Sequence, residues 1–188
     1  MGQDERDRLV EVATRLFAEL GYDQTESAQI AGAAGLPPDA VQREFGGRRE
    51  LYLEVFRQVQ EAENALLEAY TKGGLDREGC HRFIDDYIGY SLDHPEHAAL
   101  WSQRRLNDAA DLREVEHEFV VPQVVEALRA FAAVFRDDVD SELMMWTVAW
   151  TLQAFTLASR SEGSPFTDDP SVTRFRTHLH GLVDRALK

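Results

Sequence analysis

Apolar residues recur at three- and four-residue spacing over most of this chain of 188 residues, which is the periodicity of an amphipathic α-helix. The first such stripe comprises Leu9, Val12, Ala13, Leu16, Phe17 and Leu20, and Gly21 is expected to end that helix. The same pattern predicts helices at about 49–70, 77–93, 95–107, 111–135, 142–159 and 172–187. Pro122 should kink or divide the helix at 111–135. Because no stretch alternates apolar and polar residues between turn pairs, the sequence predicts an all-α fold.

Residues 21–51 have the layout of a helix-turn-helix. Thr25 or Ser27 can cap a short second helix, and Gly35 supplies the tight turn after it. The Pro37–Pro38 pair suits the first turn of a third helix, where a missing N–H costs nothing. The third helix turns Ala40, Val41 and Phe45 inward. Two short helices joined in this way typically place the second one in the major groove of DNA.

The first quarter of the chain also carries a specific set of residues, namely Ala13, Phe17, Gly21, Tyr22, Thr25, Ile30, Ala31, Ala34, Gly35, Phe45 and Leu51. With this set, the N-terminal stretch resembles the DNA-binding domain of TetR-type transcriptional regulators. The resemblance implies a three-helix helix-turn-helix domain over residues 1–48, followed by a helical ligand-binding and dimerisation domain over residues 49–188. It also implies operator DNA as a partner. The expected DNA contacts are Thr25, Gln42, Arg43, Arg48 and Arg49.

Four positions depart from the family pattern. Glu26 places a carboxylate where the family has a hydroxyl residue that meets a phosphate, and Pro37 replaces a capping serine. Gln42 stands in place of the usual tyrosine, and Glu44 in place of the usual histidine. Gln42 can still read adenine through its amide, and Arg43 can read guanine or hold a backbone phosphate.

The charge balance of the N-terminal region works against DNA. Residues 1–56 contain six arginines and eleven carboxylates. Because phosphate neutralisation supplies most non-specific DNA affinity, weak and salt-sensitive DNA binding is expected. The alternative is that Arg48 and Arg49 face DNA while the acids point elsewhere.

The last two predicted helices indicate an interface between two copies of the chain. Residues 142–159 are apolar on nearly every face, more than one protomer core needs. Two such helices from each of two chains would form an intermolecular four-helix bundle, the homodimer that the resemblance implies. The expected contacts are Leu143, Trp150, Leu157, Phe175, Leu179 and Leu182. The alternative is that residues 141–159 simply form the central core helix.

A ligand pocket is expected among the aromatic residues of the second domain. Its predicted lining is Tyr87, Tyr90, Trp101, Phe119, Trp146 and Trp150, with Arg104 and Gln123 as polar anchors. An aromatic, mostly apolar lining points to a small lipophilic or aromatic ligand. The alternative for each of these aromatics is ordinary core packing.

Composition narrows the classes of function. The formal charge of −14 argues against a general nucleic-acid coat, no apolar run is long enough to span a membrane, and the first residues are acidic where a signal peptide is basic. The single Cys80 suits a reducing cytoplasm. His94 and His97 are interpreted as exposed or core histidines, so no metal or cofactor is predicted.

The chain contains no nucleophile constellation and no phosphate-binding glycine loop, so it is not predicted to be an enzyme. Two hypotheses remain. The first is a ligand-responsive, dimeric transcriptional repressor. The second is a protein of the same fold with weakened or lost DNA binding, which acts through a protein partner or a small-molecule ligand.

Overall fold

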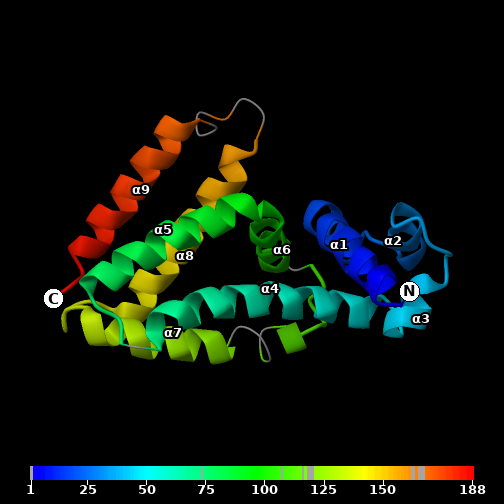
Figure 1. Cartoon of the computed structure of the whole chain (residues 1–188), viewed down its shortest axis with the longest axis horizontal. Coiled ribbons are helices and arrows are strands. Elements are labelled where there is room, and N and C mark those ends of the chain that lie inside the picture. Colours follow the sequence, from blue (N-terminus) through cyan, green and yellow to red (C-terminus); the bar gives the residue numbers. More distant parts are fainter. Residues whose placement is uncertain are drawn as a thin grey trace. The chain divides into compact units, whose positions relative to one another are not determined.

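The computed structural model describes residues 2–72, 74–106, 108–115, 117, 121–161, 164 and 168–188. Within them the helices, coloured along the chain in Figure 1, are α1 (Gly2–Leu20), α2 (Ser27–Ala33), α3 (Ala40–Phe45), α4 (Arg48–Thr71), α5 (Arg77–Asp93), α6 (Pro95–Arg105), α7 (Val121–Val134), α8 (Ser141–Ser159) and α9 (Asp169–Asp184). The described residues form no strand, and an isolated bridge joins Phe135 to Leu187. The prediction of an all-α fold is therefore confirmed.

The chain divides into two compact units. Unit 1 comprises Met1–Glu61 and Ala99–Val120, and unit 2 comprises Ala62–Ala98 and Val121–Lys188. The predicted helix-turn-helix domain, residues 1–48, lies wholly within unit 1. That unit also takes the first part of α4 and most of α6, so both helices continue from one unit into the other.

An aromatic cluster forms the centre of unit 1. The Tyr52 ring lies 5.0 Å from Phe17, 4.7 Å from Tyr22 and 4.9 Å from Phe56, measured between ring centroids. Phe56 in turn meets Trp101 of α6 edge to face at 4.8 Å. Phe17, Tyr52 and Phe56 are almost completely buried. Burial of such large rings dominates core energetics, so this cluster holds α1, α4 and α6 together.

The turn between α1 and α2 is tied to a distant part of unit 1. Gly21 ends α1 with a φ of +82°, in the left-handed region that glycine adopts readily. The next two backbone N–H groups, of Tyr22 and Asp23, donate to the two carboxylate oxygens of Asp108 at 2.7 and 3.0 Å. A Cβ added at Gly21 would lie 2.9 Å from Asp108 Oδ1. Glycine therefore allows both the turn and the close approach of Asp108.

Helix α2 begins differently from the sequence prediction. Its N-cap is Glu26, which forms a capping box with Gln29, and the Glu26 N–H donates to Gln29 Oε1 at 3.1 Å. Capping by Thr25 or Ser27 was the expectation, and it is wrong. The hydroxyl of Thr25 is fully buried and donates instead to the carbonyl of Gly21 at 2.6 Å. Glu26 and Gln29 have the three-residue spacing of a capping box, with glutamate in place of the usual serine or threonine at the N-cap.

Helix α3 also begins later than predicted. Its first residue is Ala40, whose N–H donates to the carbonyl of Pro37 at 2.9 Å, so the two prolines form a turn ahead of the helix. A residue that precedes proline is biased away from the helical region, which keeps Pro37 out of the first turn. In the second half of the chain, α7 begins at Val121 with Pro122 as its next residue. Pro122 therefore lies in the first turn of α7, where proline is tolerated, and α7 covers only the second part of the helix predicted at 111–135.

Unit 2 has a separate core, formed mainly by α5, α7, α8 and α9. Its most deeply buried side chains are Cys80, Ile88, Leu152, Leu179 and Ala186. Burial raises the pKa of the Cys80 thiol to about 11, so this cysteine behaves as a small apolar residue. The outer edge of the α5–α9 contact carries a hydrogen bond of 2.9 Å between His81 Nε2 and Asp184 Oδ1, which lowers the pKa of the Asp184 carboxyl.

No helix among the described residues has the length and apolar character needed to cross a membrane.

Asp108→Ala should destabilise unit 1 by roughly 2 kcal/mol, because two backbone N–H groups lose a charged acceptor. Chemical denaturation followed by circular dichroism and tryptophan fluorescence would measure the change. Asp108→Asn, which keeps one carbonyl oxygen, should cost about half as much. Wild-type stability in both variants would mean that the Asp108 contacts do not hold the turn.

Candidate functional site

Helix α3 presents one face to solvent and buries the other. Ala40 and Val41 are fully buried in the core of unit 1, whereas Gln42 and Arg43 are exposed. Phe45, at the end of α3, is covered by the guanidinium of Arg6, which lies 4.1 Å from the ring centroid. The buried pair fixes α3, so Gln42 and Arg43 project from a firmly held helix.

Arg43 is surrounded by carboxylates. Its Nε donates to Glu44 Oε1 at 3.0 Å, one terminal nitrogen lies 3.2 Å from Glu5 Oε2, and the other lies 3.7 Å from Asp39 Oδ1. The hydrogen bond to Glu44 and the charges of Asp39, Glu44 and Glu5 raise the pKa of Arg43. These contacts neutralise the positive charge at the exposed face of α3.

Arg48 faces into unit 1. One terminal nitrogen donates to the backbone carbonyls of Tyr22 at 3.2 Å and Thr25 at 2.6 Å. Its guanidinium also lies 4.2 Å from the centroid of the Tyr22 ring, within range of a cation–π interaction. Arg48 therefore fastens the start of α4 to the segment before α2.

Arg49 forms ion pairs with Glu114 and, at 3.5 Å, with Glu50. The charge of Glu114 is the main cause that raises the pKa of Arg49. Like Arg43, Arg49 is partly exposed and is paired with carboxylates of its own unit.

Of the five predicted DNA contacts, the structure brings Gln42 and Arg43 to the exposed face of α3. Thr25 lies buried with its hydroxyl on Gly21, and Arg48 bonds to backbone carbonyls. Sequence reasoning assigned Glu26 to a phosphate-facing position and missed its capping role. It also could not show that each arginine had acidic or carbonyl partners within the unit.

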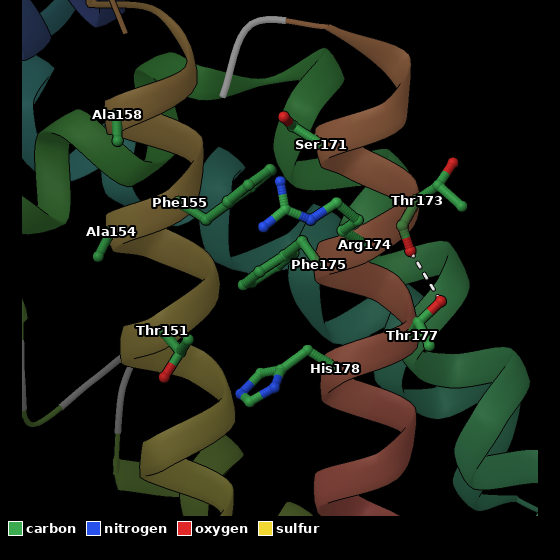
Figure 2. A pocket seen from close by; sticks show the side chains of 10 residues that line it. All are labelled: Thr151, Ala154, Phe155, Ala158, Ser171, Thr173, Arg174, Phe175, Thr177 and His178. Carbon is green, nitrogen blue, oxygen red and sulfur yellow. Dashed lines mark hydrogen bonds between the residues drawn. The ribbon is translucent and has the colours of Figure 1, made fainter. Parts of the chain in front are cut away.

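A groove of about 800 Å³ lies between α8 and α9 in unit 2. Figure 2 shows Phe155 and Phe175 between the two helices, with Arg174 and His178 reaching from α9 toward α8. The two phenylalanine rings stack face to face at 3.9 Å with an interplanar angle of 4°. The groove therefore has an aromatic floor and a polar wall on the α9 side.

The predicted dimer contacts are distributed unevenly over α8 and α9. Leu143 and Trp150 are 59% and 49% exposed, so α8 presents apolar area at its surface. Leu157, Phe175 and Leu182 are half-buried, and Phe175 lines the groove. Leu179 is fully buried, so it packs within the core of its own unit.

The predicted ligand-lining residues are divided between the two units. Trp101 packs on Phe56 in unit 1, and Arg104 there donates to the carbonyls of Asp108 at 2.9 Å and Leu112 at 3.2 Å. In unit 2, Tyr87 stacks on Phe83 at 5.6 Å, Tyr90 bonds to His97, and Trp146 stacks on Trp150 at 5.5 Å. Phe119 and the side chain of Gln123 lie outside the described residues. None of the other six lines the α8–α9 groove.

Comparison with known proteins identifies the class to which this arrangement corresponds. The family model of bacterial regulatory proteins of the tetR family matches residues 9–55, the core of unit 1. No curated protein sequence matches the chain. The family resemblance carried by the N-terminal residues is thus confirmed.

Solved structures extend the match to the whole fold. A TetR family transcription regulator from Marinobacter aquaeolei has a TM-score of 0.72 at 20% identity, with 96% of this chain and 95% of that chain covered. The fatty acid degradation regulator of Bacillus halodurans has a TM-score of 0.70 at 17% identity, covering 95% and 94%. The ketosteroid transcriptional regulator of Mycobacterium tuberculosis has a TM-score of 0.68 at 18% identity, covering 97% and 95%. The chain therefore has the fold of TetR-family transcriptional regulators.

Arg48→Ala should destabilise unit 1 by about 2 kcal/mol, since it removes two charge-assisted hydrogen bonds and the contact with the Tyr22 ring. Thermal and chemical denaturation would measure the loss. Arg15→Ala, which removes an exposed arginine of α1, is the matched control and should stay within about 0.5 kcal/mol of wild type. Equal effects of the two substitutions would contradict a structural role for Arg48.

Proposed function

We propose that this protein is a ligand-responsive transcriptional repressor that binds operator DNA as a homodimer. The observation that carries the proposal is the exposed face of α3, where Gln42 and Arg43 project from a helix whose other face is fully buried. Helix α3 is the second helix of the helix-turn-helix, the one that typically enters the major groove of DNA. An amide and a guanidinium are the groups that read adenine and guanine there.

DNA binding by this surface requires its arginines to change partners. Arg43 and Arg49 must exchange carboxylates for phosphates, and both are exposed enough for that exchange. Exposed ion pairs contribute only about 0–1 kcal/mol each, so opening them costs little. The carboxylates stay beside the DNA, however, and repel its phosphates. We therefore propose weak binding with a strong dependence on salt.

A second candidate function has support from the same contacts. If Glu5, Asp39 and Glu44 keep Arg43 neutralised, the protein would act without DNA, through a protein partner or a small-molecule ligand. The acidic surface of this candidate would favour a basic partner. Selection of genomic DNA discriminates the two candidates, because only the repressor enriches a specific sequence.

The homodimer in this proposal uses α8 and α9. Leu143 and Trp150 are large apolar side chains that are exposed on α8, and the groove between α8 and α9 has an aromatic floor. An apolar centre with a polar rim is the usual composition of a subunit interface. Docking of the same face from a second copy would cover both exposed side chains.

The ligand in this proposal is a small lipophilic or aromatic molecule. The aromatic residues of unit 2 include Tyr70, Phe83, Tyr87 and Phe131, whose rings meet around α5. Two structural relatives are named as regulators of fatty acid degradation and of ketosteroids, which are lipophilic classes. A ligand of this kind that changes the conformation of α4 would also change the conformation of unit 1, which contains α3.

Genomic DNA selection with the purified chain at low salt should enrich a palindromic sequence, and titration with salt should weaken that binding steeply. If no sequence is enriched above background, the repressor proposal is wrong and the second candidate function remains.

Glu5→Gln sharpens this test, because it removes a carboxylate 3.2 Å from Arg43. The variant should bind all DNA sequences about fivefold more tightly and increase the salt slope by up to about one unit. Glu78→Gln makes the same change of net charge in unit 2 and should leave DNA affinity unaltered. Equal gains in both variants would show that net charge alone, not the contact at Arg43, limits binding.

Leu143→Glu should convert the homodimer to monomers, weakening association at least about 100-fold, because it buries a charge without a partner at the interface. Sedimentation velocity over a range of concentrations measures the change. Leu106→Glu is a matched control, since Leu106 is a still more exposed leucine that lies in unit 1. A wild-type chain that remains monomeric would contradict the proposed dimer.

A further inference from the structure

Three potential metal ligands meet where α5 gives way to α6. His94 is the C-cap of α5, and Glu96 and His97 lie in the first turn of α6. The Nδ1 atom of His94 lies 3.5 Å from Glu96 Oε1, and Nε2 of His97 lies 3.9 Å from the same oxygen. The three ligand atoms all lie within 4.8 Å of one another. All three residues belong to unit 2.

We propose that His94, Glu96 and His97 bind a divalent transition-metal ion of the zinc type. Two imidazole nitrogens and one carboxylate oxygen are a donor set suited to Zn²⁺, Co²⁺ or Ni²⁺. Tetrahedral coordination at the usual bond lengths sets ligand atoms about 3.3–3.6 Å apart. The His94–Glu96 separation already matches this spacing, and rotations of the more exposed His94 and Glu96 side chains would bring the distances to His97 within it.

The surroundings of His97 support this assignment. Its Nδ1 forms a hydrogen bond of 2.7 Å with the hydroxyl of Tyr90, one turn before the end of α5. With the proton on Nδ1, Nε2 keeps its lone pair directed at the cluster. A hydrogen bond to the second ring nitrogen is the usual support of a metal-bound histidine, because it fixes the ring and the tautomer. Tyr90 thus supplies an outer-sphere contact.

The local backbone holds the histidines in place without a metal. The His97 N–H donates to the His94 carbonyl at 3.1 Å, and Pro95 between them starts α6. The two imidazole rings stack nearly parallel, with centroids 5.2 Å apart and an interplanar angle of 12°, so the exposed His94 ring would have to rotate for both rings to direct a nitrogen at one ion. Little chain entropy would be lost when an ion bridges side chains that are already adjacent.

Solvent can reach the cluster from one side. The side chains of His94, Glu96 and His97 are 48%, 35% and 15% exposed, so the cluster is open on the His94 side and closed around His97. An ion can enter from solvent and complete its coordination with water. Three protein ligands with one open position are the arrangement of an accessible site rather than a closed structural one.

The spacing of the residues in the sequence does not reveal this cluster. Pro95 marks a helix start between the two histidines, so the sequence favours their interpretation as exposed or core residues. The change of direction from α5 to α6 brings together side chains that a single helix would present differently. A bound ion would join the end of α5 to the first turn of α6.

The test is titration of the untagged chain with Zn²⁺ by isothermal calorimetry, together with visible absorption of the Co²⁺ form. Wild type should bind one ion per chain, with the intense visible bands of tetrahedral cobalt. His94→Ala and Glu96→Gln, both at exposed positions, should each weaken binding by more than about 100-fold while circular dichroism shows intact folding. This inference is independent of DNA binding, because the titration contains no DNA.

His178→Ala is the matched control, since His178 is an exposed histidine of α9 outside the cluster. It should bind Zn²⁺ as wild type does. Three outcomes would overturn the proposal: no stoichiometric binding by wild type, unchanged binding by His94→Ala and Glu96→Gln, or equal loss in His178→Ala.

Discussion

Tyr22 makes the contacts on which the arrangement of unit 1 depends. Its ring packs against Phe17 and Tyr52 and lies beneath the guanidinium of Arg48, while its backbone N–H bonds to Asp108. Three segments that are distant from one another in the chain therefore meet at Tyr22: the end of α1, the start of α4 and the residues around Asp108. Because α2 and α3 follow directly from this turn, the direction in which α3 exposes Gln42 is set by the packing of Tyr22.

The same packing engages arginine side chains that a DNA-binding surface would need for contacts with phosphates. Arg48 bonds to backbone carbonyls, Arg6 covers Phe45, and Arg43 and Arg49 have carboxylate partners. Stability and DNA affinity thus compete for the same side chains. The competition is unequal: the contacts of Arg48 are partly buried and directional, whereas the exposed pairs of Arg43 and Arg49 contribute little to stability and can open. Under the proposed function, Arg43 and Arg49 would therefore respond to salt, and Arg48 would not.

Periodicity predicted the helices well, because burial of one face determines a helix even when its partners are unknown. The bounds of α5 and the near-complete span of α8 follow from apolar spacing alone. Contacts between segments distant in sequence could not be predicted in this way. Asp108 lies more than 80 residues from the turn that it holds, and the partners of Arg49 include Glu114. The contacts of Trp101 and Arg104 were beyond prediction for the same reason, since their stretch of α6 packs within unit 1.

Unit 2 presents a different balance between charge and apolar surface. The chain carries a formal charge of −14, so two copies repel each other before any contact is made. Association under the proposed function must therefore come from apolar area, and α8 offers it through Leu143 and Trp150. The groove wall contributes Arg174 and His178 rather than acids, which keeps like charges away from the aromatic floor. A face that is apolar at its centre and free of acids along the groove is the part of an acidic protein on which a second acidic copy can dock at the lowest electrostatic cost.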